Sequence, residues 1–142
     1  MPPLSIIYVD DDPEDRRVVR DQVERRMRRN PFIYLSRGEE LLERLVSGQI
    51  VNPGIILVDL VLPGMSGYQL VQALRNDHKY LDRTAILIVT GTDTSTSRET
   101  AREVGADAYL PKPITLLSLM DALARLEHYD LELRDRRFDT MT

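Results

Sequence analysis

Short hydrophobic runs alternate with amphipathic segments along the chain. Five of these runs are rich in β-branched or aromatic residues and have the length of buried strands. The run Ile-Ile-Leu-Val at 55–58 is hydrophobic at every position, which is typical of a parallel strand that is covered on both faces. The five predicted strands lie at residues 5–9, 32–35, 55–58, 85–89 and 107–110.

Each hydrophobic run is followed by a segment with helical periodicity. In the first segment Val19, Val23 and Met27 recur every four residues, so they share one face of a helix that begins at Pro13. The predicted helices cover about residues 13–27, 38–46, 67–75 and 95–104, with a long helix from about 115. Strand and helix alternate five times, which predicts one doubly wound α/β domain with helices on both faces of a parallel sheet.

Length and composition narrow the classes of protein. The 142 residues suit a single domain. No hydrophobic stretch of 18 residues is present, and the N-terminus lacks the basic start and long hydrophobic core of a signal peptide, so we expect a soluble cytoplasmic protein without a membrane contact. The formal net charge of −4 gives no reason to expect nucleic-acid binding.

The residue types also limit the chemistry. The chain has no cysteine and only two histidines, which excludes thiol catalysis, cysteine-bound metal clusters and disulfides. Lysine is rare, because 17 of the 19 basic residues are arginine and only Lys79 and Lys112 are lysine. A lysine at a particular strand end is therefore more informative than an arginine would be.

Polar side chains follow the strands at the edge where open α/β sheets bind ligands. Three carboxylates that converge there repel one another unless a cation lies between them. Oxygen ligands without histidine or cysteine select a hard ion such as Mg²⁺. The sequence therefore predicts a magnesium site formed by three aspartates, with a threonine and a lysine beside it. The residues at these strand ends are Asp10, Asp11, Asp59, Thr90 and Lys112.

This set of side chains suits phosphoryl transfer. A carboxylate can attack a phosphoryl group, which makes Asp59 a candidate nucleophile as well as a metal ligand. Mg²⁺ would neutralise one side of the phosphoryl group and Lys112 the other, while the Thr90 hydroxyl would donate a hydrogen bond. For Asp12 we predict a different role, because an aspartate between a strand and a helix is commonly a helix N-cap.

Four stretches of the sequence resemble the receiver domain of two-component response regulators, over about residues 4 to 128. The resemblance implies a flavodoxin-like fold, with a five-stranded parallel sheet in the order 2-1-3-4-5 and five helices. It also implies a receiver domain at 1–129, followed by an extension of the last helix or a tail at 130–142, with no output domain. The matching stretches are IYVDDDP (7–13), ILVDLVLPGMSG (56–67), ILIVTG (86–91) and GADAYLPKP (105–113).

The resemblance assigns roles to individual residues. Asp59 would accept a phosphoryl group from the phosphohistidine of a sensor histidine kinase, and Thr90 and Lys112 would contact that group. The Val61 backbone carbonyl would join the three aspartates as a ligand of Mg²⁺. Tyr109 would be an aromatic switch residue whose ring fills the space that Thr90 leaves on moving toward the phosphate. The alternative for Tyr109 is a half-buried strand residue without a switching role.

Three further positions complete the comparison with the family pattern. Val61 replaces the polar residue often found two positions after the phosphorylated aspartate, so we expect a different phosphoryl lifetime. Gly91 stands where alanine or another small residue usually follows the threonine, and we expect it to loosen that loop and alter the switching equilibrium. The Lys112–Pro113 peptide bond is expected to be cis, as in the family.

The predicted function is a stand-alone response regulator of the chemotaxis or bacterial-phytochrome-partner type. It would catalyse only its own phosphorylation and dephosphorylation and would signal through a conformational change to partner proteins. A phosphorelay intermediate that passes the phosphoryl group to a histidine phosphotransfer protein is the alternative. The hydrophobic residues that continue from Leu116 to Leu133 predict a homodimer contact through the last helix and the tail, with a frayed tail as the alternative.

Two other classes of protein fit less well. A haloacid-dehalogenase-type phosphatase also uses an aspartate nucleophile, Mg²⁺ and a lysine, but no acidic pair follows Lys112 as that class requires. A flavodoxin-like FMN carrier needs a phosphate loop rich in Ser, Thr or Gly after the first strand. Here that loop holds Asp10, Asp11 and Asp12, which would repel phosphate unless a metal were bound.

Overall fold

Five strands form one parallel sheet at the centre of the fold. The computed structural model describes residues 4–126. The strand order is β2-β1-β3-β4-β5 and every neighbouring pair is parallel, which confirms the predicted fold class. The strands are β1 (Ser5–Val9), β2 (Phe32–Leu35), β3 (Pro53–Asp59), β4 (Ala85–Thr90) and β5 (Ala108–Pro111).

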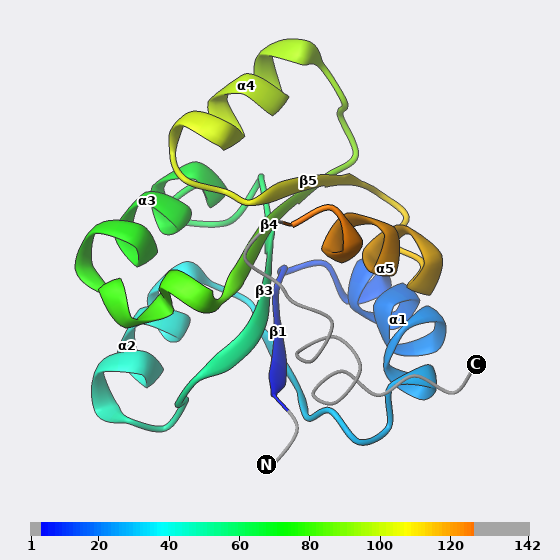
Figure 1. Ribbon diagram of the computed structural model, residues 1–142, viewed down its shortest axis with the longest axis horizontal. Helices are drawn as coiled ribbons and strands as arrows, with labels where there is room; N and C mark the ends of the chain where they lie inside the picture. Colours follow the sequence, from blue (N-terminus) through cyan, green and yellow to red (C-terminus); the bar gives the residue numbers. More distant parts are fainter. Residues whose placement is uncertain (1–3, 127–142) are drawn as a thin grey trace.

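Helices cover both faces of this sheet. Helices α1 and α5 lie side by side on one face, and α2, α3 and α4 lie on the other (Figure 1). Among the residues that the structure describes, no helix has the length and hydrophobicity needed to cross a membrane. The α-helices are α1 (Pro13–Gln22), α2 (Gly38–Ser47), α3 (Gly67–Asp77), α4 (Ser95–Glu103) and α5 (Leu116–Ala124).

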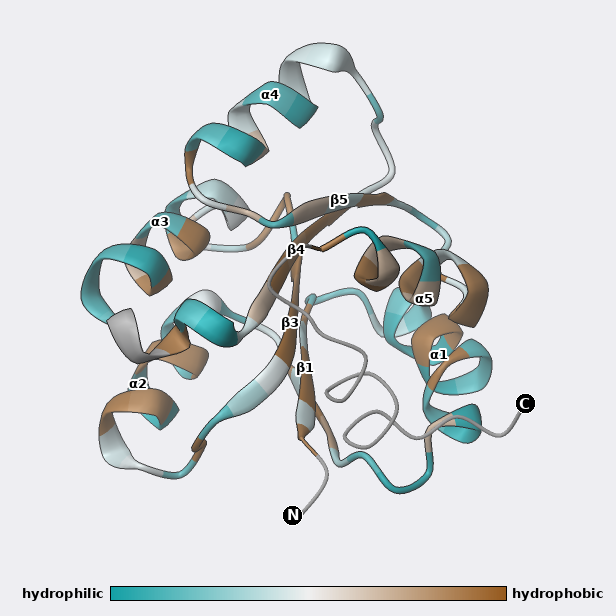
Figure 2. Cartoon of the chain, in the orientation of Figure 1, coloured by the Kyte–Doolittle hydropathy of each residue, from teal (hydrophilic) through white to brown (hydrophobic). Residues whose placement is uncertain are grey.

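The sheet divides the hydrophobic core into two layers. Successive side chains of a strand point to opposite faces, so in β3 Ile55 and Leu57 pack with α1 and α5, whereas Ile56 and Val58 pack with α2 and α3. Every residue of β3 and of β4 is buried, as their uninterrupted hydrophobic sequences predicted. Figure 2 shows the hydrophobic colour concentrated on the strands, while the helices carry both colours.

The first helix is shorter than its sequence pattern predicted. The spacing of Val19, Val23 and Met27 predicted a helix to about residue 27, but α1 ends at Gln22 and a 3₁₀ turn, η1 (Glu24–Arg26), follows. Such a tightening of the last turn is common at helix ends. The three hydrophobic side chains are nevertheless buried, so the pattern predicted burial correctly and the type of helix wrongly.

Arg75 of α3 ties three segments together where β4 and β5 begin. The two residues that precede these strands, Thr84 and Asp107, both accept hydrogen bonds from its guanidinium. Asp107 also bonds to β4, where the Ile86 N–H donates to its carboxylate at 2.8 Å. The strand β5 begins one residue later than predicted, at Ala108. The acceptors of Arg75 are the carbonyls of Gly105 (2.9 Å), Leu81 (2.9 Å) and Thr84 (3.3 Å) and the Asp107 carboxylate (2.5 Å).

The C-terminal extension predicted at 130–142 lies outside the described residues. The homodimer contact predicted through the last helix and this tail therefore stays a prediction. Within the described part, α5 begins at a capping box in which Thr115 and Ser118 bond to each other's backbone N–H. The helix buries Leu116, Leu119 and Leu123 against the sheet.

Candidate phosphorylation site

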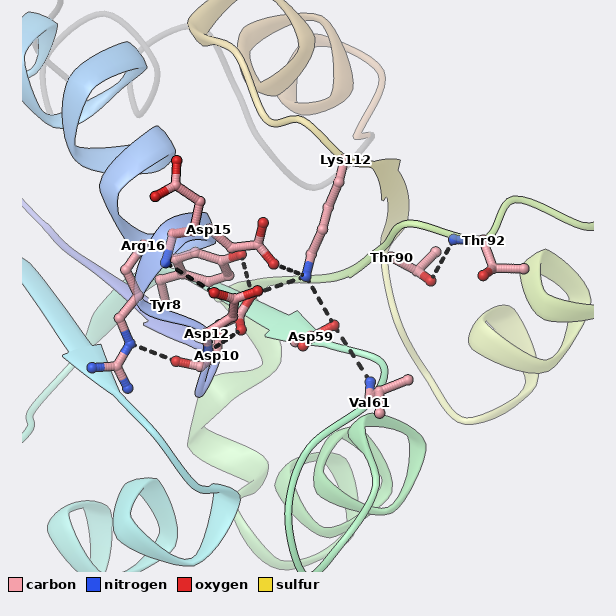
Figure 3. A network of polar contacts seen from close by, with 11 residues as sticks. Tyr8, Asp10, Asp12, Asp15, Arg16, Asp59, Val61, Thr90, Thr92 and Lys112 are labelled. Atoms are coloured by element: carbon pink, nitrogen blue, oxygen red, sulfur yellow. Dashed lines mark hydrogen bonds and ion pairs between the residues drawn. The ribbon is translucent and has the colours of Figure 1, made fainter.

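The carboxyl ends of four strands bring the predicted site residues to one edge of the sheet. Figure 3 shows the side chains of Asp10, Asp59 and Lys112 pointing toward one another from three different strand ends. One carboxylate oxygen from each of Asp10, Asp11 and Asp59 lies within 4.8 Å of the other two. This clustering follows from the parallel sheet, because the ends of all its strands face the same way.

Asp10 is the most enclosed of the three aspartates. Its side chain is fully buried, whereas Asp11 is exposed. Asp10 Oδ1 accepts a hydrogen bond from the Asp12 N–H at 2.9 Å, and Oδ2 accepts one from the Tyr8 hydroxyl at 2.5 Å. Burial, reinforced by the bond to Asp10, raises the pKa of Tyr8 far above its usual value, so the phenol keeps its proton and remains a donor.

Asp59 is the last residue of β3 and is buried. Burial raises the pKa of Asp59 from 3.8 to about 6, and the negative charge of Asp10 adds to this shift, while the Lys112 ammonium opposes it. When burial and a like charge disfavour an ionised carboxylate, a cation that comes close stabilises it. The surroundings of Asp59 therefore favour the binding of a positive ion.

The loop after Asp59 folds back against the strand. Val61 is exposed, and its backbone N–H lies 3.4 Å from Asp59 Oδ1. Gly67, the first residue of α3, passes so close that a Cβ atom there would lie 2.4 Å from the Asp59 carbonyl oxygen. A glycine at 67 therefore lets α3 begin directly beside the site. That the Val61 carbonyl is a metal ligand stays a prediction.

Lys112 is shared among three carboxylates. Its Nζ lies 2.6 Å from Asp15 Oδ2, 3.1 Å from Asp10 Oδ2 and 3.4 Å from Asp59 Oδ1. Burial alone would disfavour the ammonium, but the hydrogen bonds to Asp15 and Asp10 and the nearby negative charges raise the pKa of Lys112. The lysine is therefore a permanent positive charge at this edge of the sheet. The Lys112–Pro113 peptide bond that follows is cis, as the resemblance implies.

Asp15 is the residue of this site that sequence reasoning missed. In the sequence it stands among several charged residues of the first helix, where a solvated face is the simplest interpretation. One signal was available, because Asp15 lies in the first turn of a helix that starts at the site, and helical side chains lean toward the N-terminus. That geometry directs the Asp15 carboxylate back toward the strand ends.

Thr90 and Tyr109 are both hydrogen-bonded to the backbone of Thr92. The Thr90 hydroxyl is buried and accepts a hydrogen bond from the Thr92 N–H at 3.0 Å. The Tyr109 hydroxyl donates to the Thr92 carbonyl at 2.6 Å, and the Arg98 guanidinium carbon lies 4.9 Å from the centre of the Tyr109 ring. A shift of the loop at Thr92 would therefore change a hydrogen bond of each predicted switch residue.

Two other predicted positions have clear structural surroundings. Asp12 is the N-cap of α1, since its Oδ1 accepts from the Glu14 N–H at 2.9 Å, as predicted. Gly91 has open space around it, because beyond its chain neighbours no atom lies within 4 Å of a Cβ placed there. Packing would therefore accept the alanine that is usual in the family at this position.

Comparison with known proteins agrees with this geometry. Residues 6–124 match the family described as the response regulator receiver domain. The chain is 31% identical over 126 residues to the response regulator MprA of Mycolicibacterium vanbaalenii, which covers 87% of this chain and 50% of the relative. It is 31% identical over 128 residues to the regulatory protein VanR of Enterococcus faecium, covering 88% and 51%. The chain thus spans about half the length of the curated relatives it matches.

Solved structures share the fold. The chemotaxis protein CheY4 of Vibrio cholerae has a TM-score of 0.73 at 24% identity, covering 87% of this chain and 98% of that one. The bacteriophytochrome response regulator AtBRR has a TM-score of 0.77 at 21% identity, covering 90% and 95%. Since the sheet order, the acidic strand ends and the matched residues all agree, this chain belongs to the receiver domain family of response regulators.

Proposed function

We propose that Asp59 accepts a phosphoryl group from the phosphohistidine of a sensor histidine kinase. The observation that carries this proposal is the position of Asp59, a buried carboxylate that shares the Lys112 ammonium with Asp10 at the open edge of the sheet. In the transfer an Asp59 oxygen forms a bond to phosphorus, and the bond from phosphorus to the histidine nitrogen breaks. Receiver domains are signalling modules, and we propose that this chain catalyses only its own phosphorylation and dephosphorylation.

The donor set suits a hard divalent cation, which we propose is Mg²⁺. Asp10, Asp11 and Asp59 offer oxygen atoms alone, and the raised pKa of Asp59 reflects a site where a cation would relieve the effect of burial and the repulsion from Asp10. A structure that shares this fold, the response regulator Rcp1, was determined in a Mn²⁺-bound form (TM-score 0.70, 23% identity, covering 84% of this chain and 88% of that one). When bound, the cation supplies charge neutralisation to the phosphoryl oxygens.

The chain's own residues complete the charge balance. Lys112 already lies 3.4 Å from Asp59 Oδ1 and would pair with a phosphoryl oxygen there. We propose that the Thr90 hydroxyl gives up its bond from the Thr92 N–H and donates to the phosphoryl group. The Thr92 carbonyl is bonded to Tyr109, so this exchange would pass to β5, the strand at the edge of the sheet. A local charge change would in this way alter the surface that a partner protein meets.

Phosphorylation by a small phosphodonor tests the assignment of Asp59. The protein is incubated with Mg²⁺ and acetyl phosphate, and a labile adduct is sought by intact-mass spectrometry. We expect an adduct on the natural protein, none on Asp59→Asn and none after chelation of the metal. Asp121→Asn, which removes an exposed aspartate paired with Arg125 on α5, should be labelled as the natural protein is. No adduct on the natural protein, or an equal adduct on Asp59→Asn, would overturn the proposal.

The destination of the phosphoryl group distinguishes two forms of this function. We propose that the phosphorylated domain acts on a downstream protein, with transfer to a histidine phosphotransfer protein as the second form. Incubation of the phosphorylated protein with candidate phosphotransfer proteins separates them, since only the second form moves the label onto histidine. The single-domain organisation stays a prediction, because the curated relatives are about twice as long as the matched segment. The cytoplasmic location likewise stays a prediction.

The family membership argues against the rival classes. A haloacid-dehalogenase-type phosphatase and an FMN carrier both differ from the matched family, which covers residues 6–124. The loop after β1 carries Asp10, Asp11 and Asp12, so a phosphate group would approach it only with a cation present. The acidic loop is thus used in the proposed function rather than being an obstacle to it.

A further inference from the structure

Asp15 has no part in the function proposed above, yet it is the nearest partner of Lys112. Asp15 Oδ2 lies 2.6 Å from Lys112 Nζ, whereas the contacts to Asp10 and Asp59 are 3.1 Å and 3.4 Å long. Figure 3 shows the Asp15 carboxylate reaching Lys112 from α1, on the opposite side from Asp59. The ammonium is therefore drawn toward α1 and away from the proposed phosphorylation site.

We propose that Asp15 is a positioning residue that competes with the phosphoryl group on Asp59 for Lys112. It holds the ammonium close to α1 and so weakens the ion pair between Lys112 and the phosphoryl group. This inference rests on the proposed phosphorylation of Asp59. Its consequence is a phosphorylated state that forms less readily and lasts less long than it would without the Asp15 charge.

The donor count supports this competition. An ammonium has three N–H donors, and three carboxylates already surround Lys112. Charge-assisted bonds between ammonium and carboxylate are about 2.7–2.9 Å long. The Asp15 contact, at 2.6 Å, is at least as short as this, whereas the Asp59 contact, at 3.4 Å, is clearly longer. A phosphoryl oxygen on Asp59 therefore gains a close contact with Lys112 only if the ammonium moves away from Asp15.

Asp15 cannot readily follow the lysine, because residues on either side of it at the start of α1, Asp12 and Arg16, are bonded to Asp10. The Asp12 N–H donates to Asp10 Oδ1 at 2.9 Å, and Arg16 Nε donates to the Asp10 carbonyl at 2.5 Å. Arg16 is also bonded to Ser36, which follows β2. Lys112, by contrast, carries its charge on a flexible four-carbon stem. Any movement that serves the phosphoryl group must therefore come from Lys112 and must stretch or break its contact with Asp15.

A purely structural role is the alternative reading of the pair, in which Asp15 fastens α1 to the loop between β5 and α5. The substitution Asp15→Asn separates the two roles, because it keeps the shape of the side chain and removes the charge. If the Asp15–Lys112 pair is purely structural, its loss would lower the stability of the fold and leave the affinity for a phosphoryl analogue unchanged. Release of Lys112 would raise that affinity, whatever happens to the stability.

The test uses beryllofluoride, a phosphoryl analogue, in the presence of Mg²⁺. We expect Asp15→Asn to bind it about three- to tenfold more tightly than the natural protein in a calorimetric titration, as fits the loss of one partly exposed charge contact. The acetyl-phosphate adduct should persist longer by a similar factor. Asp21→Asn is the matched control, because Asp21 lies on the same helix and pairs with Arg17 and Arg25 instead, so its affinity should not change. Asp15→Glu keeps the charge and should remain close to the natural protein.

The outcomes separate this inference from the proposed function. Equal or weaker binding by Asp15→Asn, or an increase in Asp15→Glu of the same size, would overturn the competition. An adduct on Asp59 in both the natural protein and Asp15→Asn would then leave the proposed function intact. If neither protein forms an adduct or binds beryllofluoride, the phosphorylation of Asp59 itself fails, and the inference fails with it.

Discussion

The hydroxyl of Tyr8 donates a 2.5 Å hydrogen bond to Oδ2 of Asp10, and both side chains are buried at the end of β1. Residues two apart in a strand point to the same face, so the tyrosine lies directly beside the carboxylate. The same oxygen lies 3.1 Å from Lys112 Nζ. Tyr8 thus fixes the orientation of a proposed metal ligand from within the hydrophobic core.

Replacement of Tyr8 by phenylalanine should lower the free energy of unfolding by about 1.5–3 kcal/mol, the usual range for a hydrogen bond to a charged group. The ring still fills its place in the core, so the loss reports the hydroxyl alone. Urea denaturation measures the change. Tyr34→Phe is the matched control, because Tyr34 donates to Glu24 in a less buried place and should lose less. Equal losses in the two variants would contradict the special role of the buried pair.

The raised pKa of Asp59 predicts a pH dependence of stability in the absence of metal. Between about pH 4 and pH 6 the folded protein holds a proton on Asp59 that the unfolded chain has already released. Stability contributed by this group is therefore present at low pH and is lost as the pH rises through that window, by on the order of 3 kcal/mol. Asp59→Asn should become more stable than the natural protein as the pH rises from 4 to 7. An unchanged difference across this range would contradict the prediction.

Addition of a divalent cation should remove most of this pH dependence, since the cation stabilises the ionised carboxylate. The same measurement repeated with Mg²⁺ provides the check. The Asp59→Asn variant should respond less to the cation, because it lacks one of the three proposed ligands. A response equal to that of the natural protein would place the cation elsewhere.

Asp11 and Asp12 are neighbours in the sequence, but we expect opposite effects from their substitution. Asp12→Ala removes the N-cap of α1 and should cost about 1 kcal/mol of stability, with metal affinity nearly unchanged. Asp11→Asn should weaken Mn²⁺ or Mg²⁺ binding by about tenfold or more, with little loss of stability because Asp11 is exposed. Calorimetric metal titration and urea denaturation of both variants test this. Weaker metal binding by Asp12→Ala, or a large loss of stability in Asp11→Asn, would contradict the prediction.

Arg75→Ala should destabilise the fold by about 3 kcal/mol. The substitution removes four hydrogen bonds and leaves the partly buried Asp107 carboxylate without this partner, beside the start of β5. Arg125→Ala, which breaks an exposed ion pair with Asp121, should have no measurable effect. Thermal and urea denaturation test the contrast, and phosphorylation of Asp59 in folded Arg75→Ala should persist because Arg75 lies at the opposite end of the strands.

The strands, their order along the chain and most of the proposed site could be predicted from local sequence. Hydrophobic runs such as 55–58 indicate strands that are buried on both faces, and the aspartate that ends such a run must lie at the ligand-binding edge of a parallel sheet. The N-cap role of Asp12 was predictable for the same reason, since it depends on residues next to it in the chain. Local periodicity was less reliable for helix type, as the 3₁₀ turn after Gln22 shows.

Contacts between distant residues were decided by the tertiary structure alone. The sequence by itself determined that Asp10, Asp59 and Lys112 stand at strand ends, because strand position depends on local hydrophobic pattern. It did not determine that Asp15, 97 residues before Lys112, is the nearest carboxylate to that lysine. That distance depends on how α1 packs on the sheet and how far a flexible lysine reaches. A charge on a helix face becomes part of a site only when packing brings an opposite charge to it.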